Sequence, residues 1–220
     1  MSDPRVSEAR GALAHHFDDL EQQHDAATLG MWVFLVTEIM FFGGLFLGYT
    51  VYRWKYPHIF ADASRHLDTT IGAVNTAVLL ASSLTMALAV HAAQTSRRRA
   101  LVGLLLATML LGSVFLGVKA YEYRDKYVHH LVPGVDFVYE PGARPQLQIF
   151  FLFYFFMTGM HALHMVIGIG LLGVIAALAW RGRYGADYYN PVEVTGLYWH
   201  FVDIVWIFLF PLLYLIGAHL

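Results

Sequence analysis

The sequence contains no cysteine, and only 14% of its 220 residues are charged. The absence of cysteine excludes disulfide scaffolds, cysteine zinc sites, cysteine-ligated iron–sulfur clusters and thiolate nucleophiles. A soluble domain carries about 25% charged residues, so the low share of charge excludes an ordinary cytosolic enzyme. The formal net charge of −2 lacks the basic surplus that phosphate binding requires, which argues against nucleic acid as a partner.

Hydrophobic residues make up 58% of the chain, and they fall into five long blocks. The blocks are Gly30–Tyr52, Gly72–Ala93, Ala100–Val118, Gln148–Trp180 and Leu197–Ala218. About 20 apolar residues span the hydrocarbon core of a bilayer, and backbone groups in lipid must be satisfied within a helix. The sequence therefore predicts an all-α integral membrane protein, with five transmembrane helices in a bundle.

The chain divides into a polar cytoplasmic N-terminal segment, residues 1–29, and a membrane domain, residues 30–220. The polar segment lacks the apolar stretch of a signal peptide, and a short surface helix is expected over His15–Asp25. The connections Arg53–Ile71 and Lys119–Leu147 contain several prolines and glycines and are expected to be loops.

Basic residues close to the ends of the blocks favour one orientation in the membrane. Arg97–Arg99 follows the second block, and Arg181 and Arg183 follow the fourth. Since basic residues in short loops stay on the cytoplasmic side, we expect the N-terminus inside and the C-terminus outside. The aromatic run Phe150–Phe156 opens an unusually long block, so it is expected to form an interfacial belt or to mark a tilted helix.

Glu38 is an ionisable residue about 12 Å into the first block, at a rise of 1.5 Å per residue. A carboxyl group at this depth is costly and marks a functional candidate. It can face a cavity, a lipid or another subunit; alternatively it is a neutral structural residue hydrogen-bonded to a neighbouring helix. Gly44 and Gly48 form a GxxxG pattern on another face, where close helix packing is expected.

Histidines supply the remaining intramembrane candidates. His161 and His164 are three residues apart and share a helix face with Gly168, a further position expected in helix packing. Histidine is a common metal and haem ligand, but no second histidine lies at matching depth, so interhelical hydrogen bonding is the favoured interpretation. No metal site and no catalytic group is predicted.

The last block carries His200 and Asp203 on one stripe. These two side chains can bond to each other or bridge to another helix, either as a fixed structural pair or as part of a proton relay. Trp199 and Trp206 flank the stripe and suit the membrane interface. Asn75, at the start of the second block, is expected to cap the helix or to donate to another helix.

The order of these residues resembles the cytochrome c oxidase subunit III family. The first block is similar to that family's membrane-glutamate helix, the fourth to its TGxHxLHxxxG helix and the last to its WHFVDxxW helix. The matching segments are Trp32–Phe42, Asn75–Ser83, Glu122–Tyr123, Thr158–Gly168, Glu193 and Tyr198–Trp206. The resemblance runs in order through all five blocks.

The resemblance implies an accessory subunit of a proton-pumping haem–copper terminal oxidase in the bacterial inner membrane. Haem and copper are then expected in partner subunits, and this chain holds no redox cofactor but binds phospholipids. It packs on oxidase subunit I, contacts other oxidase subunits, sustains proton uptake and turnover stability, and can enter a respiratory supercomplex. The resemblance places Glu38 near lipid and subunit I, and gives His161, His164, Glu193, His200 and Asp203 roles in helix packing and lipid contacts.

Departures from the family pattern leave alternatives open. The mitochondrial form has two further helices, and Lys119 stands where that form has glutamine. A quinol oxidase subunit III or a subunit associated with nitric oxide reductase fits the same motifs. Two different classes remain as rivals: a haem-binding subunit that uses His161 or His164, and a small proton-coupled transporter that uses Glu38 and Asp203.

Overall fold

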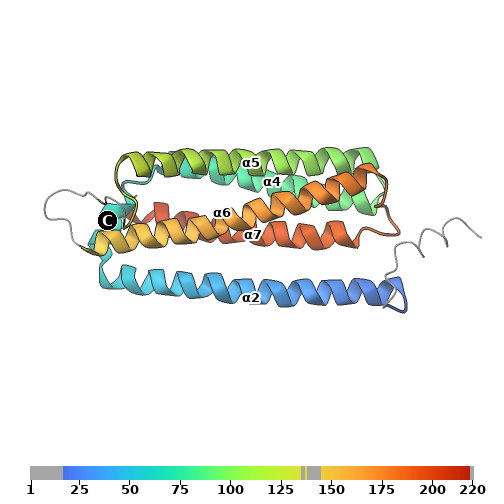
Figure 1. Cartoon of the computed structure of the whole chain (residues 1–220), viewed down its shortest axis with the longest axis horizontal. Coiled ribbons are helices and arrows are strands. Elements are labelled where there is room, and N and C mark those ends of the chain that lie inside the picture. The colour runs from blue at the N-terminus through green and yellow to red at the C-terminus, as the bar shows by residue number, and fades with distance from the viewer. Residues whose placement is uncertain (1–16, 135–136, 138–144, 219–220) are drawn as a thin grey trace, which may run out of the picture.

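The computed structural model describes residues 17–134, 137 and 145–218, and within them every regular element is helical (Figure 1). The helices are α2 (Leu20–Lys55), α3 (Pro57–Ser64), α4 (Thr69–Gln94), α5 (Arg98–Val128), α6 (Pro145–Trp180), α7 (Asn190–Tyr214) and a short 3-10 turn, η1 (Ile216–Ala218). Five of these helices are long and apolar enough to cross a membrane. The predicted all-α fold with five membrane spans is therefore confirmed.

Local signals explain where several helices begin. The side chain of Asp19 accepts a hydrogen bond of 2.7 Å from the backbone N–H of Gln22, and Asp68 accepts from the second and third residues of α4. These carboxylates satisfy backbone donors that have no partner within the helix. Proline occupies the first turn of α3 and of α7, where its missing N–H costs nothing.

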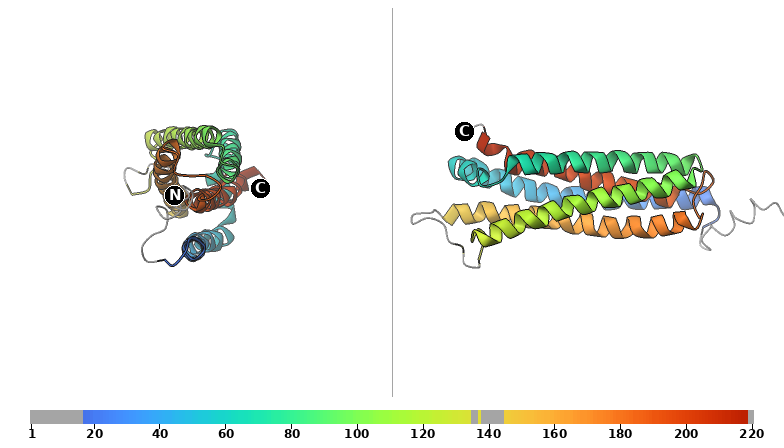
Figure 2. Two further views of the ribbon diagram at one scale, coloured as in Figure 1. Left: turned by 90° about the vertical axis from the view of Figure 1, so that its right-hand side faces the viewer. Right: turned by 90° about the horizontal axis from the view of Figure 1, so that it is seen from above.

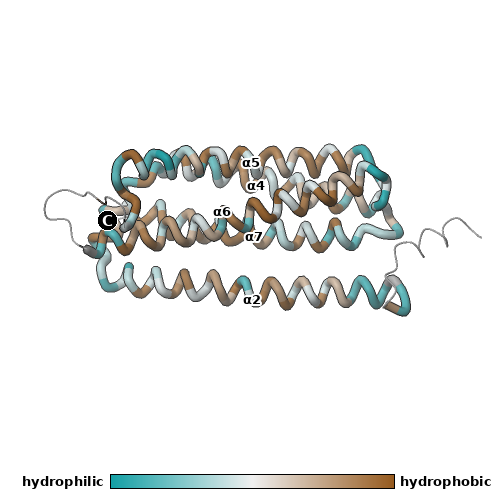
Figure 3. Tube along the Cα trace, viewed as in Figure 1, coloured by the Kyte–Doolittle hydropathy of each residue, from teal (hydrophilic) through white to brown (hydrophobic). Residues whose placement is uncertain are grey.

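Helices α4, α5, α6 and α7 form a four-helix bundle, and α2 lies along its side (Figures 1 and 2). The contact of α2 with the bundle is a narrow seam, because its buried apolar side chains are Leu35, Phe42 and Tyr49, at intervals of one heptad. Most other apolar side chains of α2 are exposed, as expected for a helix that faces lipid or other chains. Hydropathy is highest in the middle of the helices and lowest at their ends (Figure 3).

The structure corrects several expected boundaries. Both predicted loops are partly helical: α3 lies within Arg53–Ile71, and α5 continues ten residues past Val118 to Val128. From Leu20 onward, the separate surface helix expected over His15–Asp25 is instead the start of α2, which runs without a break across the expected boundary at residue 29. A helix of 36 residues is about 54 Å long, longer than a hydrocarbon core of about 30 Å, so α2 extends beyond the apolar region.

Several of the aromatic residues considered for an interface are buried within the protein. Phe150, Phe151 and Tyr154 from the aromatic run are fully buried, as are Trp199 and Trp206. Each indole N–H donates to a hydroxyl of α4, at 3.2 Å for Trp199 to Ser82 and 2.9 Å for Trp206 to Thr76. Interior hydroxyls thus satisfy the polar atoms that would otherwise favour an interfacial position.

The two arginine-rich turns lie at one end of the bundle, the same end as the start of α2 (Figure 1). The turns interlock there, because Arg98 Nε donates to the carbonyl of Ala179 and Ser96 Oγ accepts from the backbone N–H of Ala186. This arrangement is consistent with the expected orientation, which stays a prediction. Opposite it, α3 and η1 pack together beside the end of α7.

Candidate functional site

The intramembrane glutamate of α2 faces a histidine of α6 across the seam. Glu38 Oε2 and His164 Nε2 are 3.2 Å apart, and their side chains are 19% and 11% exposed. The pair therefore lies at the edge of the bundle, partly open to what surrounds the protein. The ring of Phe42 stacks edge-on against His164 with centroids 5.4 Å apart, which shields one side of the pair.

The second nitrogen of His164 fixes the tautomer of the neutral ring. His164 Nδ1 is 2.8 Å from the carbonyl oxygen of Met160, and a carbonyl only accepts hydrogen bonds, so Nδ1 carries a hydrogen. In the neutral imidazole, Nε2 is then an acceptor that faces a carboxyl oxygen of Glu38. A proton on either partner would turn this contact into an attraction.

The backbone around this pair is held in place by a tyrosine of α7. The hydroxyl of Tyr198 donates to the carbonyl of His164 at 3.0 Å, and its ring lies 6.1 Å from that of Phe34 on α2. Three helices thus meet at the pair. The arrangement places a carboxyl group and an imidazole side by side at the surface of the bundle.

His161 does not share this site, although it is one helical turn away. It is fully buried, and neither ring nitrogen has a hydrogen-bond partner within the described residues. Its ring packs against Phe115 at 5.5 Å and Trp206 at 5.2 Å between centroids. Among the described residues no three histidine, aspartate or glutamate side chains are grouped closely enough to hold a metal ion.

His200 and Asp203 are placed separately as well. His200 Nδ1 lies 2.8 Å from the hydroxyl of Ser83, so this histidine bridges α7 to α4. Asp203 is buried in the same interface, and neither carboxyl oxygen is hydrogen-bonded within the described part of the chain. The structure therefore does not join Asp203 to Glu38 in a hydrogen-bonded relay. Glu193 lies in the first turn of α7, where its carboxylate suits the positive end of the helix dipole.

The three glycines expected in helix packing differ in their surroundings. A Cβ at Gly168 would lie 3.0 Å from the ring of Trp199, so α6 and α7 approach closely there. A Cβ at Gly48 would meet Phe153 of α6 at an ordinary 3.5 Å. Gly44 is exposed, and nothing in the described residues lies within 4 Å of its Cβ position. The GxxxG pattern therefore does not bring α2 tightly against another helix of this chain.

A second polar cluster, between α5, α6 and α7, was not predicted from the sequence as a site. Lys119 Nζ donates to Glu122 Oε2 at 2.9 Å, to Tyr214 at 2.7 Å and to Tyr154 at 3.3 Å. Both tyrosine hydroxyls donate in turn to Glu122 Oε1, at 2.6 Å and 2.8 Å. The lysine also lies 4.9 Å above the ring of Trp206, so all three of its N–H groups and its charge are accommodated.

The sequence contains a signal for this lysine–glutamate cluster. Lys119 and Glu122 are three residues apart, a spacing that brings opposite charges together on a helix. The expected end of the block at Val118 hid the signal, because it placed both residues in a loop. The extension of α5 to Val128 makes them part of a helix with a buried face.

Comparison with known proteins gives one consistent family. The family model described as "Cytochrome c oxidase subunit III" matches residues 11–218. A relative named cytochrome c oxidase subunit 3, from Thermostichus vulcanus, is 32% identical over 200 residues, which cover 90% of this chain and 92% of the relative. A probable quinol oxidase subunit 3 from Staphylococcus epidermidis is 28% identical over 206 residues, covering 93% and 96% of the two chains. Another from Staphylococcus aureus is 27% identical over 202 residues, covering 91% and 94%.

Proposed function

The chain belongs to the cytochrome c oxidase subunit III family, and on this premise we propose that it is an accessory subunit of a haem–copper terminal oxidase. It is a multi-pass membrane protein of bacterial type. In the proposed complex, haem and copper belong to partner subunits, and this chain packs against subunit I. The proposed role of this chain is to sustain proton uptake and to increase the number of turnovers that the enzyme completes before it is inactivated.

The observation that supports this role most directly is the Glu38–His164 pair. It places a carboxyl group and an imidazole 3.2 Å apart on a partly exposed edge of the bundle, where a proton can arrive from a neighbouring subunit or from a lipid surface. Because the seam on either side of Glu38 is narrow, α2 can respond to the state of the pair without disrupting the bundle. A carboxyl group with a purely structural role would need neither the partial exposure of Glu38 nor the acceptor nitrogen of His164 opposite it.

The test is to replace Glu38 in the intact oxidase and to count turnovers before activity is lost. We expect Glu38→Ala and Glu38→Gln to leave haem content unchanged and to shorten the lifetime during turnover. Glu38→Gln is informative because its amide can still donate to His164 Nε2 but cannot ionise. Glu21→Gln, which makes the same change at the polar start of the same helix, serves as the control and should behave like the wild type. An unchanged lifetime in both Glu38 variants would refute the proposal.

A quinol oxidase is the second candidate complex, because relatives with that name match the chain over nearly its whole length. The two candidates differ in the electron donor, which acts on other subunits. Purification of the tagged complex, followed by oxygen-uptake assays with reduced cytochrome c and with a quinol, distinguishes them. The donor that supports uptake identifies the branch.

The same purification tests the rival classes. Reduced-minus-oxidised spectra before and after the chain is stripped from its partners show where haem resides. Haem that stays with the partners supports the accessory role, and haem that stays on this chain would make His161 and His164 candidate ligands. Absence of haem from both fractions would favour the proton-coupled transporter. A larger native assembly that contains other respiratory complexes would show supercomplex membership.

A further inference from the structure

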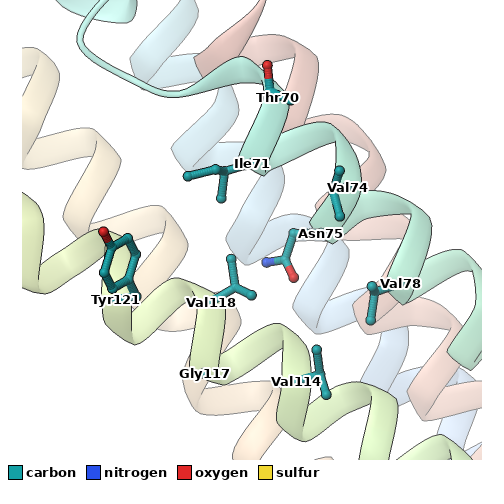
Figure 4. A pocket seen from close by; sticks show the side chains of 9 residues that line it. All are labelled: Thr70, Ile71, Val74, Asn75, Val78, Val114, Gly117, Val118 and Tyr121. Carbon is teal, nitrogen blue, oxygen red and sulfur yellow. The ribbon is translucent and has the colours of Figure 1, made fainter.

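A groove of about 600 Å³ opens between α4 and α5 on the outside of the bundle (Figure 4). Apolar side chains, four of them valines, form most of its walls, and two of these valines, Val74 and Val114, are 61% and 44% exposed. Gly117 leaves its floor open, since nothing in the described residues lies within 4 Å of a Cβ placed there. The groove therefore has room for a thin apolar ligand.

The groove is slightly shorter than the hydrocarbon half of a bilayer. Its lining runs along α4 from Thr70 to Val78 and along α5 from Val114 to Tyr121. At 1.5 Å per residue these stretches are about 10–12 Å long, compared with about 15 Å for half of a hydrocarbon core. Thr70 is the second residue of α4, so the groove begins at a helix end and runs toward the middle of the membrane.

Polar side chains lie at one end of the groove. The Thr70 and Tyr121 side chains stand on opposite sides of that end (Figure 4). Arg124 follows Tyr121 by three residues on α5, so it lies one turn further out on the same helix face. It is exposed and forms no ion pair with any described residue, which leaves its charge available to an external anion.

We propose that this groove binds one acyl chain of an anionic phospholipid, whose phosphate pairs with Arg124 and whose glycerol region lies between Thr70 and Tyr121. A mostly apolar groove that runs from a helix end toward the middle of the membrane, with two hydroxyls and an unpaired guanidinium at its outer end, suits a ligand with an acyl chain and an anionic head group. The site deepens the proposed function, because it assigns the expected phospholipid to particular residues. It is independent of the Glu38–His164 pair, which lies on the α2 side of the bundle.

The test measures phospholipid retained by the intact oxidase after purification in mild detergent, by native mass spectrometry and by lipid extraction. Gly117→Leu places a side chain in the groove, and its Cβ would meet no atom of the described residues within 4 Å. Gly103→Leu is the matched control, because Gly103 is also an exposed glycine of α5 with an open Cβ position, and it does not line the groove. Arg124→Gln removes the charge and keeps the groove.

We expect Gly117→Leu to lose one phospholipid per complex, and Gly103→Leu to retain it. Arg124→Gln should lower the preference for anionic over zwitterionic lipid about fivefold, which corresponds to about 1 kcal/mol for one basic residue near a membrane surface. Equal phospholipid content in all variants would overturn the proposal, as would a quinone or a segment of another subunit in the groove of the assembled complex. Haem content and turnover lifetime test the proposed function separately from the lipid site, because both can still be measured in variants that have lost the bound phospholipid.

Discussion

The lysine–glutamate cluster predicts a strong asymmetry between single and double substitutions. Glu122→Gln leaves Lys119 as a buried cation without its counter-charge, and breaking a buried ion pair in this way costs about 3–5 kcal/mol. For a chain of this size 1 kcal/mol corresponds to about 2–4 °C, so the melting temperature should fall by about 6–20 °C. Adding Lys119→Met removes the orphaned charge, while glutamine still accepts from the hydroxyls of Tyr154 and Tyr214. The double variant should therefore recover more than half of the loss.

The assay is the temperature at which this chain dissociates from the purified oxidase, followed by native gel and by residual activity. Asp62→Asn is the control, because Asp62 pairs with Arg65 and the two side chains are 66% and 56% exposed, and exposed pairs contribute at most about 1 kcal/mol. If the double variant is as unstable as Glu122→Gln, or if Glu122→Gln melts like the control, the lysine–glutamate cluster is not a coupled ion pair and the reasoning fails.

Two further predictions concern packing and pH. Gly112→Ala places a Cβ 2.8 Å from the ring of Trp199 and should destabilise the complex by about 1–3 kcal/mol. Gly44→Ala places its Cβ in open space and should be neutral or stabilising. The prediction is checked by comparing the temperatures at which the two variants dissociate from the complex. Burial and the charge of Lys126 lower the pKa of His66 from 6.5, so the folded state binds fewer protons there than the unfolded chain. Stability should then fall as the pH drops below about 6.5, and His66→Gln should reduce that loss between pH 7 and pH 5; an identical pH profile in wild type and variant would contradict it.

The membrane fold was predictable because lipid leaves the backbone few choices. A chain that cannot hydrogen-bond to its surroundings must form helices, so apolar length alone predicted five spans. The ends were less predictable, since polar residues continue a helix without any change in backbone pattern. In the helical segment Lys119–Val128, Lys119 and Glu122 are buried by partners on α6 and α7 that are distant in the sequence, so their burial could not be predicted locally.

The residues of the candidate site could be predicted from the sequence, but the contact between Glu38 and His164 could not. Depth and chemistry singled out Glu38 and His164, yet only the packing of α2 beside α6 brings them to 3.2 Å. The spacing of His161 and His164 suggested a common role, but the 60° between the rotational positions of residues three apart is enough to point one into the bundle and the other to its edge. Trp199 and Trp206 were placed at the interface on residue type, while hydroxyls of a neighbouring helix hold them in the core.

The two buried charge arrangements differ in a way that separates structure from function. Lys119 and Glu122 lie on one helix, their N–H groups and oxygens are used by fixed partners, and no proton has to move for the cluster to be satisfied. Glu38 and His164 lie on different helices, and the carbonyl of Met160 fixes the ring so that Nε2 faces the carboxyl group. This contact crosses the seam, where α2 has few other buried contacts. The Glu38–His164 pair therefore contributes to the packing of α2 on the bundle, whereas the lysine–glutamate cluster holds α5, α6 and α7 together.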